Sequence, residues 1–149
     1  MSTRQEKLAK LKEVNDARNA KLDEIDAAAA DKRLDNELLI AELEAKNNLT
    51  LNVDMGVVWL TDGSMVVIRK PTYLAYERYQ IDIQDAEKNA KIEVRDAYLK
   101  ECVIHPTMQA AQQLNDVNGS CLFAACNLAN RMHDSAGDSM EGKSKRAAS

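Results

Sequence analysis

The first 47 residues contain neither glycine nor proline, and this constrains the fold more than any other feature of the sequence. The stretch is rich in Ala, Leu, Glu and Lys, which lose little conformational freedom in a helix. Ser2, followed by Gln5 and Glu6, has the pattern of a helix N-cap. Asn47 begins an Asn-Asn pair that can end a helix, because asparagine tolerates the left-handed conformation. The pattern predicts one long helix over residues 2–47.

The apolar residues of this predicted helix are sparse. Asn15 and Arg18 are polar where a heptad repeat would place apolar side chains, and Leu34 lies outside the register. We therefore interpret residues 1–47 as a charged arm or weak coiled coil that gains stability from a partner. The apolar positions along it are Leu8, Leu11, Leu22, Ile25, Ala29, Leu38, Leu39 and Leu43.

A β-hairpin is the firmest local prediction. Residues 57–60 and 65–68 are apolar on both faces and flank the sequence Thr-Asp-Gly-Ser. Asp62 and Gly63 form a pair favoured in type I′ turns, where both central residues need positive φ. Residues 49–53 alternate apolar and polar with period 2, which predicts a third strand.

Both faces of such a hairpin require cover, because two strands alone are marginally stable. The helices that follow can cover one face. Residues 49–53, the N-terminal helix or another protein chain can cover the other, and an open strand edge invites pairing with a foreign strand. This is a first argument for a partner.

The C-terminal half is predicted to be helical. Apolar residues at spacings of three and four predict one helix from Thr72 to about Val103, and the residue before Pro106 ends it. Short helices follow over residues 107–114 and 120–132, the second with Leu122, Ala125, Ala129 and Met132 on one face. The predicted class is therefore α+β, mostly helical, with a long N-terminal helix, a small antiparallel hairpin or three-stranded sheet, and a C-terminal helical bundle.

The predicted organisation has three parts. Residues 1–47 are the arm, residues 48–133 are a compact domain of hairpin and helices, and residues 134–149 are a flexible polar tail. Deletion of residues 1–47 should then leave a folded remainder that assembles poorly.

Charge and hydropathy exclude two classes of partner. A formal net charge of −4 gives no long-range attraction for a phosphate backbone, so we expect no nucleic acid partner. No apolar run approaches the roughly 18 residues that span a bilayer, and the N-terminus lacks a secretory signal. We expect an intracellular protein with no membrane partner and no cofactor.

Three cysteines without an export signal favour free buried thiols over disulfides. Cys102, His105, Cys121 and Cys126 have the side-chain types of a zinc site, but their spacing is loose and suits buried thiols better. A small zinc- or thiol-dependent regulatory module built on these four residues is thus an alternative. No nucleophile motif accompanies them, and the carboxylates are spread among cations along helical faces, so we expect no enzymatic activity.

The order of features over residues 57–106 is similar to that of a known group of viral proteins. A hairpin with "TDGS" leads through "IRKPT" into the helix "YLAYERYQ", and a later helix ends in "YLKECVIHP". This order resembles the small tail assembly chaperones and related morphogenesis proteins of tailed bacteriophages. The resemblance implies binding to phage tail components during assembly in the host cytoplasm, or retention as a minor virion component, without catalysis.

The leading hypothesis is therefore a bacteriophage structural or assembly protein acting through protein–protein contacts. Its partners would be other phage structural proteins or copies of itself, in a homo-oligomer or a larger assembly. A cytoplasmic coiled-coil adaptor with no viral connection is a further alternative. The candidate contact residues are Trp59, Leu60, Val66, Ile68, Tyr73, Leu22, Ile25, Leu39 and Leu43.

Overall fold

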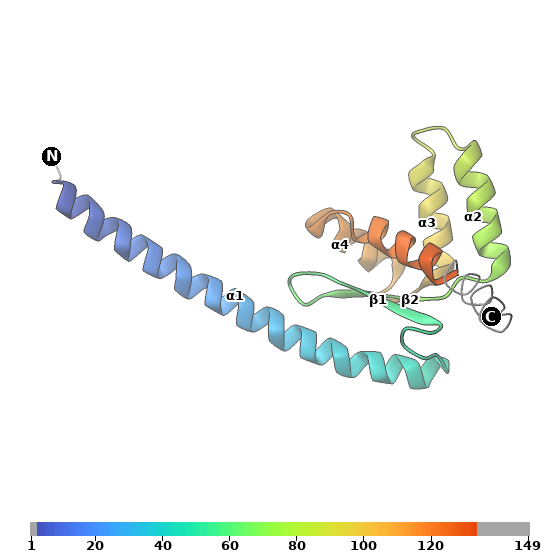
Figure 1. The fold of residues 1–149 in the computed structure, drawn as a ribbon, viewed down its shortest axis with the longest axis horizontal. Helices are drawn as coiled ribbons and strands as arrows, with labels where there is room; N and C mark the ends of the chain where they lie inside the picture. Colours follow the sequence, from blue (N-terminus) through green and yellow to red (C-terminus); the bar gives the residue numbers. More distant parts are fainter. Residues whose placement is uncertain (1–2, 134–149) are drawn as a thin grey trace, which may run out of the picture.

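The computed structural model describes residues 3–133 and has the predicted class, α+β and mostly helical (Figure 1). The predicted tail over residues 134–149 lies outside the described residues. The elements in chain order are α1 (Arg4–Asn47), β1 (Met55–Trp59), β2 (Met65–Arg69), α2 (Tyr73–Asp85), α3 (Lys91–Cys102), β3 (Val103–His105), α4 (Met108–Asn118) and a further helix over residues 121–133.

The long helix α1 is confirmed. It has 44 residues, which corresponds to about 66 Å at the usual rise per residue. Thr3 caps it, one residue after the predicted Ser2. The Thr3 hydroxyl accepts from the Glu6 amide, and the Glu6 side chain accepts from the Thr3 amide. At the other end Asn48 adopts the left-handed conformation, as predicted for this Asn-Asn pair.

The hairpin is confirmed, but its turn differs from the prediction. β1 and β2 pair antiparallel, and Trp59 lies opposite Met65. Within the turn only Gly63 has positive φ, so the turn is not type I′. The Leu60 amide donates to the Ser64 carbonyl at 2.8 Å, and the Gly63 amide donates to the Leu60 carbonyl at 3.1 Å. The connection is therefore a hairpin loop of more than two residues, in which a glycine with a left-handed backbone conformation follows the turn.

The third strand is β3, and the prediction of a strand over residues 49–53 is wrong. The sheet order is β1-β2-β3, with β3 antiparallel to β2. Residues 49–53 instead form a turn in which the Val53 and Asp54 amides both donate to the Thr50 carbonyl. Asn52 has positive φ, and a single bridge joins Leu51 to Met55. Local turn bonds outweighed the alternating pattern.

The sheet lies between two helical layers (Figure 1). Alternate residues of β2 face opposite layers. Met65 and Val67 pack with Ile40 of α1, whereas Val66 and Ile68 pack with the C-terminal helices. The N-terminal helix is therefore the element that covers the second face of the hairpin, one of the three solutions considered above.

The predicted helix from Thr72 to Val103 is in fact two helices. α2 ends at Asp85, and α3 starts at Lys91 and runs back beside it. The Tyr79 and Tyr98 rings stack with centroids 4.4 Å apart, a contact that a continuous helix could not make. Tyr98 and Leu99 are buried as a result. No glycine or proline marks the break, so helix packing determines it.

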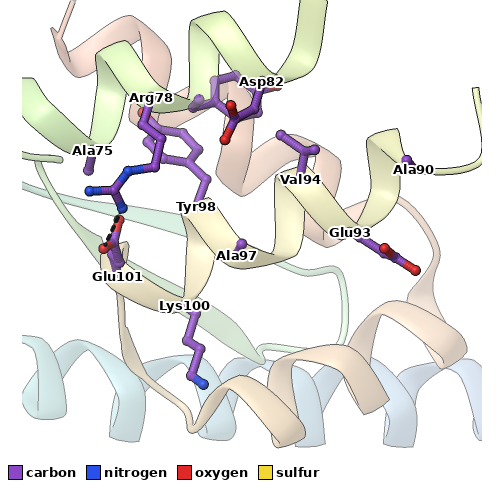
Figure 2. Close-up of a pocket in the computed structure, with 11 residues that line it drawn as sticks. Ala75, Arg78, Asp82, Ala90, Glu93, Val94, Ala97, Tyr98, Lys100 and Glu101 are labelled. Carbon is purple, nitrogen blue, oxygen red and sulfur yellow. Dashed lines mark hydrogen bonds and ion pairs between the residues drawn. The ribbon is translucent and has the colours of Figure 1, made fainter. Parts of the chain in front are cut away.

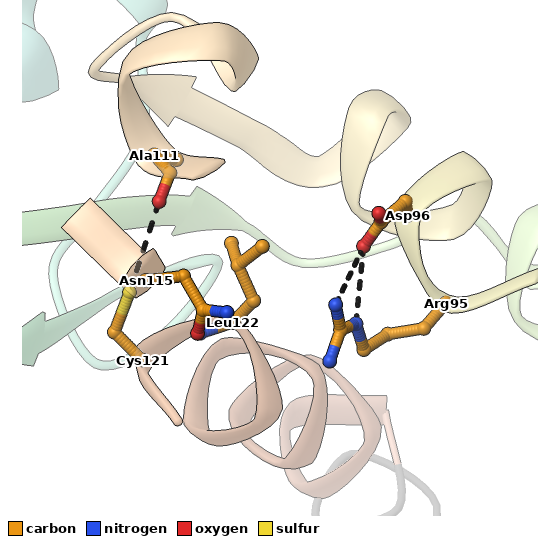
Figure 3. Close-up of polar contacts among 6 residues, drawn as sticks. All are labelled: Arg95, Asp96, Ala111, Asn115, Cys121 and Leu122. Carbon is orange, nitrogen blue, oxygen red and sulfur yellow. Dashed lines mark hydrogen bonds and ion pairs between the residues drawn. The ribbon is translucent and has the colours of Figure 1, made fainter. Parts of the chain in front are cut away.

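The last helix packs across the sheet through small and aliphatic side chains. Leu122, Ala125 and Ala129 are buried, which confirms the predicted face. A β-carbon added to Gly56 of β1 would come within 2.9 Å of Leu128, so the strand and this helix are in close contact. At its start, the Leu122 amide donates to Asn115 of α4 (Figure 3).

Candidate interaction surfaces

The N-terminal half of α1 projects away from the rest of the chain (Figure 1). Every residue from 4 to 28 is exposed, along about 37 Å of helix. Four aliphatic side chains of this half are each exposed by half or slightly more: Leu8 55%, Leu11 51%, Leu22 55% and Ile25 52%. Isolated helices gain most of their stability from packing an apolar face, and no described residue of the chain covers this half.

One continuous line of residues links the projecting half of α1 to the half that packs on the sheet. We call it the α1 stripe: positions 8, 11, 15, 18, 22, 25, 29, 32, 36, 39 and 43, at alternating spacings of three and four. Leu39 and Leu43 are half-buried and pack with the core cluster around Met55 and Val67. The α1 stripe is thus an intramolecular contact after Ala29 and open before it.

The hairpin turn marks the boundary between the two halves. The Asn36 side-chain amide donates to the Gly63 carbonyl at 2.8 Å. A β-carbon on Gly63 would collide with the Ala29 carbonyl oxygen and lie 3.0 Å from the Arg33 amide nitrogen. Glycine at this position therefore allows the turn to rest directly on the helix backbone.

Two charged contacts surround this turn. The Arg33 guanidinium lies over the Trp59 ring, 4.4 Å from its centroid. Lys32 Nζ lies 3.9 Å from a carboxylate oxygen of Asp62. The Ser64 amide donates to Asp62 at 2.9 Å, and this bond, with a smaller contribution from Lys32, lowers the pKa of the Asp62 carboxyl.

The predicted contact residues of the hairpin divide into two groups. Val66 and Ile68 are fully buried in the core, so they are not available to a partner in this conformation. Trp59 and Leu60 are half-buried, and Trp59 is already covered by Arg33. An apolar pattern on both faces of a strand indicates burial here, because helices cover both faces.

Exposed apolar residues also occur on α2. Tyr73, a predicted contact residue, is 68% exposed, and the centroid of its ring lies 5.8 Å from that of His133. Leu74 and Ile81 are 64% and 55% exposed and were not predicted. The Tyr76 ring stacks on His133 at 3.9 Å, so the last described residues are fixed against the start of α2.

A groove of about 680 Å³ lies between α2 and α3. Figure 2 shows Val94, Ala97 and Tyr98 along one side of it, with Arg78 and Glu101 at its rim. Arg78 and Glu101 form an ion pair of 3.3 Å, half exposed to solvent. The groove surface is mainly apolar, and two of its charged lining residues, Arg78 and Glu101, are paired with each other.

The three thiols are free and buried, as predicted. Burial raises the pKa of all three, and that of Cys102 to about 12, so they are poor nucleophiles. The Cys121 thiol contacts the Ala111 carbonyl at 3.8 Å (Figure 3). Burial lowers the pKa of His105. Within residues 3–133, no three His, Cys, Asp or Glu side chains are arranged to hold a metal ion, so Cys102, His105, Cys121 and Cys126 do not form one ligand set.

No described helix is at once long enough and apolar enough to cross a membrane. Comparison of the chain with protein-family models, with curated proteins and with solved structures found no match.

Sequence reasoning identified Leu22 and Ile25 as contact residues, and both lie on the projecting half of α1. It missed Leu8 and Leu11 as members of the same surface, although it placed them on the helix. The signal that could have identified Leu8 and Leu11 is their position on the same line of three- and four-residue spacings as Leu22. It also missed the contact of Asn36 with the turn, because the partner lies 27 residues away and no local pattern indicates it.

Proposed function

We propose that this chain is a non-catalytic structural or assembly protein of a tailed bacteriophage, acting through protein–protein contacts. The projecting half of α1 is the observation that carries the proposal. It presents four half-exposed aliphatic side chains on one face, well separated from the folded domain. A helix with an unpaired apolar face is suited to binding another helix or a groove.

The phage setting depends on the sequence resemblance of residues 57–106 to tail assembly chaperones and morphogenesis proteins. In that setting the protein acts in the host cytoplasm during assembly and can remain in the virion as a minor component. Its partners are other phage structural proteins or copies of itself. A coiled-coil adaptor outside a virus would use the same surface, so the biological context must be tested directly.

Two features of the chain support a binding role over thiol chemistry. The thiols are buried and their pKa values are raised, so none is a ready nucleophile. The net charge of −4 disfavours nucleic acid, in agreement with a partner that is a protein.

The test uses a phage whose genome encodes this chain. The Leu22→Glu/Ile25→Glu variant places charges on the projecting apolar face, whereas Ala20→Glu/Ala27→Glu places the same charges on the opposite side of the same exposed segment. We expect the first variant to reduce the yield of complete tailed particles, seen by electron microscopy, and the second to assemble normally. Normal particles from both variants, or from a phage lacking the gene, would contradict the proposal.

A further inference from the structure

We infer that the exposed half of α1 pairs antiparallel with the same segment of a second copy of this chain. The inference uses only the geometry and charges of α1, so it stands whether or not the phage setting is correct. It identifies the partner of the exposed face, the direction of pairing and the register.

The α1 stripe is symmetric over its exposed part. From Leu8 to Ile25 it reads apolar, apolar, polar, polar, apolar, apolar. In an antiparallel pair the a positions of one helix lie opposite the d positions of the other, since the chains run in reverse. Reversal about the point between residues 16 and 17 sets Leu8 against the partner's Ile25. The same reversal sets Leu11 against the partner's Leu22.

The two polar positions then meet each other. Asn15 lies opposite the partner's Arg18, and the asparagine side-chain oxygen can accept from the guanidinium. A parallel pair would instead place Arg18 against the partner's Arg18, with like charges at the centre of the interface. Shifting the antiparallel register by one heptad would set apolar side chains against polar ones. The interruptions that weaken a regular parallel coiled coil therefore specify this arrangement.

Charge along the helix favours the same direction. Residues 4–12 carry four cations and one anion, whereas residues 21–29 carry three anions and one cation. In the proposed register these two segments lie side by side, so basic faces acidic at both ends of the pair. A parallel pair would bring basic to basic and acidic to acidic.

The length of the exposed segment fits the register. Arg4, the first residue of α1, would lie opposite the partner's Ala29. Ala29 is the residue whose backbone the Gly63 turn approaches, and it is the first half-buried residue of α1. The partner helix therefore covers the free part of the stripe and ends where the hairpin turn begins to cover it.

Disulfide trapping in the full chain tests direction and register together. Leu8→Cys and Ile25→Cys chains are prepared separately and oxidised alone or as a mixture; the native thiols are buried. We expect a covalent dimer linking positions 8 and 25 in the mixture and little from either variant alone. In the proposed pair two copies of position 8 are about 25 Å apart, beyond the reach of a disulfide. If each variant alone forms a covalent dimer and the mixture contains no dimer linking position 8 to position 25, the antiparallel pairing is overturned.

Sedimentation equilibrium of the unlinked chain provides a second readout. We expect a concentration-dependent dimer that Leu22→Glu/Ile25→Glu weakens by about 100-fold or more, because two charges per chain enter the interface. Ala20→Glu/Ala27→Glu should dimerise like the natural sequence. A monomer at all concentrations, with no cross-linked product, would show that a second copy is not the partner. If the natural chain is such a monomer and the Leu22→Glu/Ile25→Glu phage still loses complete particles, the proposed function stands and this inference falls.

Discussion

The Asn36 side-chain amide donates a 2.8 Å hydrogen bond to the Gly63 carbonyl, joining the middle of α1 to the turn of the hairpin. Asn36 and Gly63 are 27 positions apart in the sequence. Their contact lies where α1 changes from a packed helix to an exposed one. The domain therefore includes the second half of α1, and only residues 4–28 form the projecting part.

Replacing Asn36 with alanine should destabilise the domain. Alanine is the better helix former, but the Gly63 carbonyl would lose a partner, at a net cost of about 0.5–1.5 kcal/mol. Asn127→Ala is the matched control, since Asn127 is exposed in the last helix. Denaturant unfolding followed by Trp59 fluorescence should show a lower free energy of unfolding for Asn36→Ala alone. Equal stability of the two variants would contradict a stabilising role for this bond.

Truncation should separate the two halves of α1. Removal of residues 1–28 is expected to leave the remainder folded, because every described residue of that segment is exposed. Removal of residues 1–47 should prevent folding, since it uncovers Met55 and Val67, which are fully buried. The sequence alone predicted that a chain lacking residues 1–47 would fold, and the packing of α1 on the sheet reverses that prediction. Circular dichroism melting checks both, and a cooperative transition in the longer truncation would argue against the revision.

Stability should fall at alkaline pH. The pKa of Cys102 is raised by burial to about 12 in the folded chain, against an ordinary value of 9.0. Above pH 9 the unfolded thiol loses its proton while the folded one retains it, so stability is fully present below that pH and declines above it. From pH 8 to pH 10, Cys102 contributes a loss of about 1 kcal/mol.

Guanidinium unfolding at the two pH values measures this loss. Cys121 and Cys126, whose pKa values are also raised, add to it in the same direction. In Cys102→Ala the difference between pH 8 and pH 10 should be smaller, whatever that variant's stability at pH 8. An unchanged difference would mean that the buried thiol is not its source.

Removal of the Tyr79 hydroxyl should lower the stability of the domain, whereas removal of the Tyr98 hydroxyl should not. The Tyr98 hydroxyl is buried with no hydrogen-bond partner among the described residues, whereas the Tyr79 hydroxyl interacts with Cys126 and Asn130. Tyr98→Phe should be neutral or stabilising by up to about 1 kcal/mol, and Tyr79→Phe destabilising by about 1 kcal/mol. Both variants keep the stacked rings, so thermal melts compare the hydroxyls alone. A destabilised Tyr98→Phe would contradict the assignment.

Features with local causes were predictable from the sequence. The long helix, its Asn terminator and the hairpin depend on neighbouring residues, and all three are present. The break between α2 and α3 was not predictable, because no local signal marks it and the Tyr79–Tyr98 stack across it depends on the tertiary fold. Strand β3 was missed for the same reason: three residues become a strand only beside β2.

The candidate surface was partly predictable. Apolar spacing indicated Leu22 and Ile25, but spacing alone could not distinguish Leu22 from Leu39, which lies on the same stripe and packs on the domain. Apolar patterns in Val66 and Ile68 were likewise compatible with a binding face or a core, and the structure places them in the core. Burial depends on which elements meet, and that information lies outside the local sequence.

Hydrogen exchange at two protein concentrations tests the central claim most directly, namely that residues 4–28 of α1 form an association surface outside the domain. We expect these amides to exchange rapidly in dilute solution and to become protected at high concentration, while residues 29–47 stay protected in both. Equal protection of residues 4–28 at both concentrations would show that the segment is stabilised within its own chain. Rapid exchange at both would show that a second copy does not cover it.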